Sequence, residues 1–369
     1  MRNVFYQAVL LLITAGSTIA LSINNPPAAS KPNMAVIAYY AGDANGFQQY
    51  PTQQLTHIIY SFLHLNGTAF TFDTPKDQST VAALVALKDQ NSRLKVMLSL
   101  GGWGGCETCS QVFGTAQGRA EFATSVKQVL IATHTDGIDL DWEYPAVAGP
   151  PGHRFAPEDR HNFTLLIQTL RATLGNDYEI SFAAGGFPDY LQHAVEWAAV
   201  MPLVNRVNLM SYDLVNGYST ITGHHTPLYA TPQQGLSIDS GVHFLDSVGV
   251  APNKIVIGAA FYARVFSGVQ PRNQGLYQAG KFKQTFNYKE FTDSLSMARG
   301  FVTYWDDVAQ APYAYSARRQ EFASFDDKKS IQLKTRYARA KHLGGIMFWE
   351  LTGDNPQHGL LESLYRAAR

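Results

Sequence analysis

Three acidic side chains at alternate positions are the feature of this sequence most suggestive of chemistry. Asp139, Asp141 and Glu143 fall within one short stretch, and apolar residues occupy the positions between them. Because successive side chains of a β-strand point to opposite faces, the three carboxyl groups would share one face. Burying carboxylates together is costly unless they are paired or share protons, so folding alone gives no reason for this arrangement.

Clustered carboxylates of this kind indicate acid catalysis. Like charges close together raise the pKa of one member, which can then keep its proton near neutral pH. Glu143 stands nearest the carboxyl end of the expected strand and is the best placed proton donor, while Asp141 and Asp139 lie progressively deeper and could relay a proton. A divalent metal site is one alternative, but three acids on one strand would not surround an ion well. A solvated edge strand is another, and the flanking apolar residues argue against it.

The elements that would position these acids follow from eight short apolar runs. Most are rich in β-branched and aromatic residues, which is typical of strands buried on both faces, and helix-like stretches such as 159–174 and 330–342 separate them. This alternation predicts an α/β fold, the (β/α)8 TIM barrel. An open doubly wound sheet is the alternative, but no glycine-rich phosphate turn follows the first run. The runs are 34–40, 57–63, 94–100, 137–143, 179–184, 206–212, 254–261 and 345–350.

The spacing is uneven between the seventh and eighth runs. About 65 residues separate Arg264 from Lys329, which is too long for an ordinary loop. We therefore expect a small insertion at about 270–325 between strand 7 and strand 8. It would lie where the strands end, which is the active-site face of such barrels.

The N-terminal residues predict export. Arg2 precedes a short apolar run, and small residues follow as far as Ala20, so residues 1–20 resemble a signal peptide. A buried first helix is the alternative. Residues 21–33 contain three prolines and indicate a linker before a catalytic domain at 34–369. No later segment reaches the length of a membrane helix, so we expect a secreted or periplasmic protein.

Composition narrows the classes of function further. The chain has 29 Lys and Arg against 29 Asp and Glu, and this zero net charge argues against a nucleic-acid binder. Its two cysteines, Cys106 and Cys109, lack the additional ligands of a zinc site. In an exported protein we expect them to form a local disulfide. We expect a monomer without metal or cofactor.

Five motifs stand in order along the chain. The stretch 136–143 has the form Asp-x-x-Asp-x-Asp-x-Glu, and it is accompanied by SLGGW at 99–103, MSYD at 210–213, FYAR at 261–264 and FWE at 348–350. Together they resemble glycoside hydrolase family 18, which includes chitinases. The similarity runs from about residue 34 to the C-terminus, and five ordered motifs are very specific.

The resemblance implies a retaining hydrolase of chitin or chito-oligosaccharides in which the substrate's own N-acetyl carbonyl is the nucleophile, an exception to the scheme with two catalytic carboxylates. Glu143 would protonate the glycosidic oxygen, Asp141 would hold the acetamido N–H, and Asp139 would share a proton with Asp141. Tyr212 would orient the acetamido carbonyl, and Trp349 would form the floor under the reacting sugar. The other substrate-binding residues that it implies are Met210, Asp213, Tyr39, Phe62, Trp103 and Arg264.

Other interpretations stay open. An endo-β-N-acetylglucosaminidase acting on N-glycans would use the same carboxylates. A non-catalytic chitin-binding lectin is a second rival, although such relatives usually lack the acid that stands here as Glu143. Tyr212 and Trp349 could be ordinary barrel packing, and Arg264 could pair with Asp213 without touching sugar.

Overall fold

The computed structural model describes Met1 and residues 34–369. The predicted linker, and the predicted signal peptide apart from Met1, therefore lie outside the described residues. Within residues 34–369, no helix is long and apolar enough to cross a membrane.

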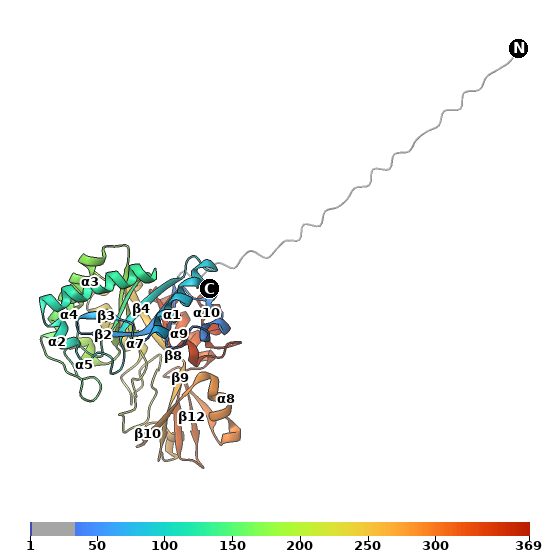
Figure 1. The fold of residues 1–369 in the computed structure, drawn as a ribbon. Coiled ribbons are helices and arrows are strands. Elements are labelled where there is room, and N and C mark those ends of the chain that lie inside the picture. Colours follow the sequence, from blue (N-terminus) through green and yellow to red (C-terminus); the bar gives the residue numbers. More distant parts are fainter. Residues whose placement is uncertain (2–33) are drawn as a thin grey trace. The chain divides into compact units, whose positions relative to one another are not determined.

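Eight parallel strands close into a barrel (Figure 1). The ring closes because the first strand pairs with both the second and the last. The predicted (β/α)8 TIM barrel is therefore confirmed. The barrel strands are β1 (Ala35–Tyr40), β2 (His57–Asn66), β4 (Lys95–Gly101), β5 (Gly137–Asp141), β6 (Glu179–Gly185), β7 (Arg206–Met210), β8 (Ile255–Ala260) and β14 (Gly345–Trp349).

Each predicted run coincides with one barrel strand, but two strands end two residues earlier than predicted. β5 ends at Asp141 and β7 ends at Met210, so Glu143 and Tyr212 each lie two residues beyond a strand. The apolar and alternating pattern continues past the last ladder hydrogen bonds because Glu143 is still buried and Tyr212 is still partly buried at the barrel mouth. This correction places both side chains where barrels build their active sites.

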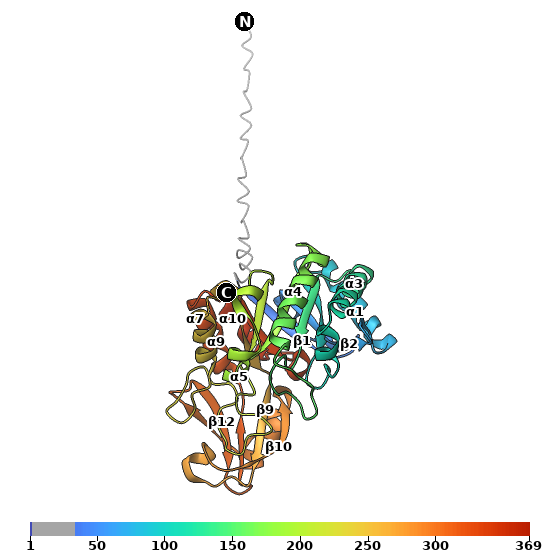
Figure 2. The same cartoon turned by 90° about the vertical axis from the view of Figure 1, so that its left-hand side faces the viewer.

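Helices cover the outside of the barrel in both views (Figure 2). A large apolar cluster fills the space between strands and helices, whereas a smaller cluster that includes Ile37, Met97 and Val256 fills the barrel interior. The short strand β3 (Ala69–Thr71) extends β2 as a hairpin. The main helices are α1 (Pro75–Ala86), α3 (Ala116–Thr133), α4 (Asp159–Leu174), α7 (Ile238–Ser247), α9 (Lys328–Ala340) and α10 (Leu360–Ala368), with short helices α2 (Cys109–Phe113), α5 (Pro188–His193) and α6 (Trp197–Val200).

An antiparallel sheet of five strands is inserted between β8 and α9, in the order β10-β9-β13-β12-β11 (Figure 2). It begins at Tyr262, earlier than the predicted start near residue 270, because its first strand follows β8 after a single residue and the sequence contains no turn between them. Each face of the sheet packs against its own apolar cluster. Its strands are β9 (Tyr262–Ser267), β10 (Lys281–Asn287), β11 (Val302–Asp306), β12 (Ala311–Ser316) and β13 (Glu321–Ser324), and the short helix α8 (Phe291–Ser294) follows β10.

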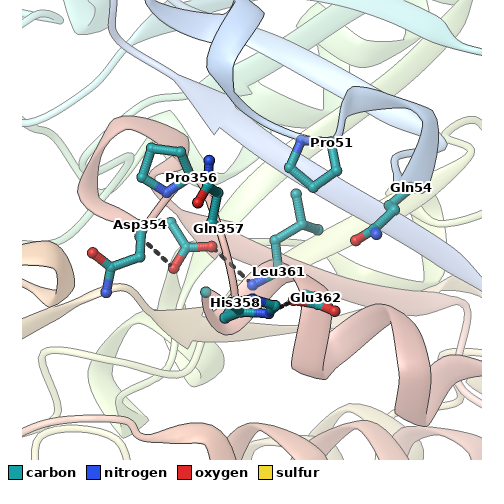
Figure 3. Close-up of a pocket in the computed structure, with 10 residues that line it drawn as sticks. Pro51, Gln54, Asp354, Pro356, Gln357, His358, Leu361 and Glu362 are labelled. Atoms are coloured by element: carbon teal, nitrogen blue, oxygen red, sulfur yellow. Dashed lines mark hydrogen bonds and ion pairs between the residues drawn. The ribbon is translucent and has the colours of Figure 1, made fainter.

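The C-terminal helix is anchored by one buried carboxylate. Asp354 accepts hydrogen bonds from the backbone N–H groups of Asn355, Leu360 and Leu361, at 2.8, 2.7 and 2.9 Å (Figure 3). The Tyr50 hydroxyl donates to the carbonyl oxygen of Asp354 at 3.3 Å. The bonds from Leu360 and Leu361 satisfy the first two N–H groups of α10, which have no partners within the helix.

We expect Asp354→Ala to lower the free energy of unfolding by about 2–4 kcal/mol, because three N–H groups lose a charged acceptor. Urea unfolding followed by circular dichroism measures this change. Gln357→Ala is the matched control, because Gln357 lines the same small pocket but is exposed to solvent (Figure 3). Equal stability of the two variants would contradict the anchoring role.

Candidate active site

The three predicted acids come together at the carboxyl end of β5. Asp139 and Asp141 lie on the strand, Glu143 follows it, and all three side chains are buried. In the sheet, Asp139 stands opposite Ser99 of β4 and Ser181 of β6. The alternation seen in the sequence therefore places the carboxyl groups in one column that runs from the barrel interior to its mouth.

Asp139 is held by four donors from four other strands of the barrel. Ser181 Oγ and Asn208 Nδ2 donate to its Oδ1 at 2.6 and 3.1 Å. Ser99 Oγ and the Tyr39 hydroxyl donate to its Oδ2 at 2.9 and 3.0 Å. Burial raises the pKa of Asp139, and these hydrogen bonds oppose that rise. Of the three acids, Asp139 is the one whose negative charge is best stabilised.

Asp141 has one carboxylate oxygen without a protein partner. Its Oδ1 is buried and makes no hydrogen bond to any described residue. Burial raises the pKa of Asp141 well above its ordinary value, and the charges of Glu143 and Asp139 raise it further. The described contacts include no hydrogen bond between Asp141 and Asp139, so their shared proton stays a prediction. An unpaired buried acceptor is costly and is expected where a ligand supplies the missing donor.

Glu143 is suited to hold a proton near neutral pH. Burial raises its pKa to about 7, a hydrogen bond with Tyr144 opposes this rise, and the negative charge of Asp213 adds to it. A carboxylic acid in such an environment can donate a proton at physiological pH.

Tyr212 contributes a phenol directed at the same region. Burial raises its pKa well above the ordinary value, and Tyr262, Asp141 and Glu143 raise it further. The phenol therefore stays protonated and can donate. Its recorded contact is a weak one, with Met347 Sδ at 3.8 Å, which leaves the donor available for a stronger acceptor. Met210, the last residue of β7, is partly buried and packs against the cluster inside the barrel.

Asp213 forms an ion pair with Arg264, which is the pairing given above as the alternative to sugar contact by Arg264. The guanidinium donates to Asp213 Oδ1 at 2.7 Å and to Oδ2 at 2.5 Å, and His225 Nδ1 lies 3.6 Å from Oδ1. Although burial opposes it, the nearby His225 and the ion pair with Arg264 hold the pKa of Asp213 well below its usual range. Asp213 is therefore a permanent negative charge beside Glu143.

Aromatic rings form a floor beside the acids. Trp349 stacks on Phe62 with ring centroids 5.6 Å apart and an interplanar angle of 16°, and Tyr39 lies 6.0 Å from Trp349. A Cβ atom on Gly102, where φ is +82°, would come within 2.4 Å of the Phe62 ring. Gly102 therefore lets the Phe62 ring pack directly on the backbone.

A second pair of rings is exposed nearby. Trp103 is 53% exposed and Tyr218 is 63% exposed, and their centroids lie 6.2 Å apart. Trp103 also meets the edge of Tyr144, the residue after Glu143, at 6.3 Å. Trp103 precedes a short turn at the start of α2 that a disulfide between Cys106 and Cys109 closes.

Sequence reasoning missed four residues of this region. Ser99, Ser181 and Asn208 hold Asp139, and each is a polar residue in an otherwise apolar strand. That interruption is a signal, but its meaning depends on the strand register, which sets Ser99 and Ser181 opposite Asp139. Tyr218 lies in a loop with no distinguishing pattern.

No group of three or more His, Cys, Asp or Glu side chains in residues 34–369 is arranged to hold a metal ion. The raised pKa of Glu143, the unpaired oxygen of Asp141 and the protonated phenol of Tyr212 allow proton transfer and hydrogen bonding.

Comparison with known proteins gives consistent matches. The pattern of the family described as glycosyl hydrolases family 18 matches residues 35–354. Chitinase A1 of Niallia circulans is 33% identical over 315 residues, and the alignment covers 78% of this chain but 45% of that protein. Chitinase 1 of Aphanocladium album is 31% identical, covering 81% of this chain and 76% of the relative. A family 18 N-acetylglucosaminidase from Paenibacillus barengoltzii has a similar structure, with a TM-score of 0.84 and 35% identity over 91% of this chain and 100% of that one.

These matches and the site define a glycoside hydrolase built on a (β/α)8 barrel. Within that class, the chain belongs to glycosyl hydrolases family 18, as its ordered motifs predict.

Proposed function

We propose that the protein is a chitinase that hydrolyses β-1,4-linked N-acetylglucosamine with retention and with assistance from the substrate's acetamido group. One observation carries the proposal: Glu143, with a pKa of about 7, lies in the same carboxylate column as Asp141, which has a free acceptor oxygen. We further propose export to the periplasm or the cell exterior, on the strength of the N-terminal pattern alone.

In the first step, protonated Glu143 gives its proton to the glycosidic oxygen as the bond to the anomeric carbon breaks. The acetamido carbonyl oxygen attacks that carbon and forms a cyclic oxazolinium ion. The leaving sugar departs as a neutral alcohol. In the second step, ionised Glu143 takes a proton from a water molecule. The water oxygen bonds to the anomeric carbon as the bond to the acetamido oxygen breaks, which opens the oxazolinium ring and restores the protonated acid.

Two further side chains serve the acetamido group. The free Oδ1 of Asp141 accepts its N–H, which turns the nitrogen into a better electron donor and orients the carbonyl. The Tyr212 hydroxyl donates to the carbonyl oxygen. Asp139, whose carboxyl group is held by four donors, shares a proton with Asp141 and so adjusts the negative charge that stabilises the positive charge developing on the ring.

The aromatic rings account for sugar binding. A pyranose ring presents C–H groups that pack on aromatic faces. Trp349 forms the floor under the reacting sugar, with Phe62, Tyr39 and Met210 around it. Trp103 receives the leaving sugar, and Arg264 acts through Asp213.

Hydrolysis of a ladder of N-acetylglucosamine oligomers by the purified protein tests the proposal. Short oligomers among the products support a chitinase. Release of single sugars alone would instead favour the activity named for the Paenibacillus barengoltzii neighbour. Deglycosylation of a glycoprotein without cleavage of the ladder would favour the N-glycan enzyme, and binding without cleavage would favour the lectin.

We expect Asp213→Asn to move the basic limb of the kcat/KM profile to lower pH by about one unit. Asp213 raises the pKa of Glu143, so removing its charge lowers that pKa, and unpaired Arg264 lowers it further. Because the acid works only when protonated, activity is then lost at a lower pH. Asp189→Asn, at an exposed carboxylate on α5, is the control. A limb that stays in place or moves upward would refute this coupling.

A further inference from the structure

One face of the inserted sheet begins at the candidate active site. Tyr262, Arg264 and Phe266 alternate along β9 and therefore share this face. Tyr262 lies with its ring centroid 6.2 Å from that of Tyr212, and Arg264 pairs with Asp213. The face thus continues outward from the reacting groups.

A β-bulge adds a further ring to this face. Phe282 of β10 pairs with Phe266 and Gln284 pairs with Val265, so Lys283 is the extra residue. Directly opposed residues of an antiparallel pair lie on the same face, and the extra residue brings Phe282, instead of Lys283, to the face of Arg264. Consistent with this, the guanidinium carbon of Arg264 lies 5.5 Å from the centroid of the Phe282 ring.

The loop that carries Tyr218 is bonded to the segment that leads into β10. The Gly280 N–H donates to the Thr220 carbonyl at 3.0 Å, and the Thr222 N–H donates to the Gln278 carbonyl at 2.8 Å. The Tyr218 N–H in turn donates to Asn216 Oδ1 at 2.9 Å, which fixes the turn.

Phe282 lies directly against this turn. A Cβ atom on Gly217 would be 3.4 Å from Phe282 Cδ1, so the ring packs beside the residue that precedes Tyr218. Trp103, Tyr218 and Phe282 therefore follow one another from the barrel mouth onto the inserted sheet, and each is exposed. We call these three rings the aromatic strip.

We propose that Phe282 is a sugar-stacking platform that extends the binding site on the leaving-group side, where it takes an N-acetylglucosamine residue of a long oligomer beyond those at Trp103 and Tyr218. This inference rests on the proposed function. A sugar chain fits the strip because Trp103 contacts Tyr218, Phe282 packs beside the neighbouring Gly217, and polar groups such as Arg264 stand among the rings. Flat rings held by a bonded turn and an ion-paired arginine lose little freedom on binding.

Calorimetry in the Glu143→Gln background tests the platform without turnover. We expect Phe282→Ala to weaken binding of the N-acetylglucosamine hexamer by about 3- to 10-fold, and to leave the dimer within about twofold, because only a long chain reaches the ring. Phe282→Tyr should restore hexamer affinity. Tyr229→Ala is the matched control, because Tyr229 is 39% exposed against 36% for Phe282 but packs on Tyr337 of α9.

The outcomes separate the two proposals. Unchanged hexamer affinity in Phe282→Ala, or equal losses for hexamer and dimer, would overturn the platform while wild-type hydrolysis left the proposed function standing. Absence of hexamer binding and of hydrolysis would overturn both. If Phe282→Ala does not fold, Phe282→Leu keeps the apolar contact with Gly217 but lacks a flat ring, and it should show the same loss for the hexamer alone.

Discussion

Replacing Glu143 by glutamine should lower kcat on N-acetylglucosamine oligomers by about 1,000- to 10,000-fold while binding is retained. The amide keeps the shape of the side chain and can still form hydrogen bonds, but it is not acidic enough to protonate the glycosidic oxygen. The loss should appear in kcat more than in KM, because the proton transfer belongs to the transition state.

The same substitution should leave the fold intact or stabilise it. Glu143 is buried beside Asp141, and burial already raises its pKa to about 7, so ionisation there carries a cost that the amide removes. Thermal unfolding measures this directly. Glu158→Gln is the matched control, because Glu158 is exposed and its backbone carbonyl, rather than its carboxylate, makes the recorded contact. Wild-type turnover in Glu143→Gln would show that Glu143 is not the proton donor. A markedly lower melting temperature would show that the variant loses activity through its fold and would contradict the expected stability.

The three acids form a graded set, which explains how one strand can carry them. Asp139 has four donors, which oppose the rise that burial gives to its pKa. Asp141 has an oxygen with no protein partner. Glu143 keeps its proton to about pH 7. The cost of burying three carboxylates is thus reduced by hydrogen bonds at the deep end and by a retained proton at the mouth. The set thus runs from Asp139, which is held by donors, to Glu143, which keeps a proton that it can donate. An acid catalyst with a charged intermediate requires such an arrangement.

Local patterns explain why the barrel could be predicted from the sequence. Strands buried on both faces are short, continuously apolar and separated by amphipathic helices, and each of these signals is complete within about 15 residues. The alternation at Asp139, Asp141 and Glu143 is likewise local. The ends of β5 and β7 cannot be read from this pattern, because Glu143 is buried and Tyr212 is partly buried beyond the ladder.

The remaining features depend on contacts between segments far apart in the sequence. Ser181 and Asn208 become partners of Asp139 only through the register of β5, β6 and β7. The bulge at Lys283 needs the pairing of β10 with β9 before it can be recognised. Tyr218 lies in a turn whose position is set by bonds to the residues before β10. None of these contacts produces a periodic pattern in the sequence of either segment, so none can be predicted from one segment alone.

Tyr212→Phe is expected to lower kcat by about 10- to 1,000-fold, the usual scale for the loss of one hydrogen bond made in the transition state. The phenylalanine ring keeps the contact with Tyr262, whose centroid lies 6.2 Å away, so packing survives while the donor to the acetamido carbonyl is lost. Because the hydroxyl's recorded partner is Met347 Sδ at 3.8 Å, its removal should cost little stability.

Tyr315→Phe is the matched control for Tyr212→Phe, because it also removes a single phenol hydroxyl. The Tyr315 hydroxyl donates to the Val269 carbonyl at 2.8 Å inside the inserted sheet, so its loss should lower stability by about 1 kcal/mol and leave kcat unchanged. Paired kinetics and urea unfolding of the two variants therefore separate chemistry from packing. Full activity in Tyr212→Phe would place Tyr212 among the packing residues of the barrel and leave Asp141 alone to orient the acetamido group.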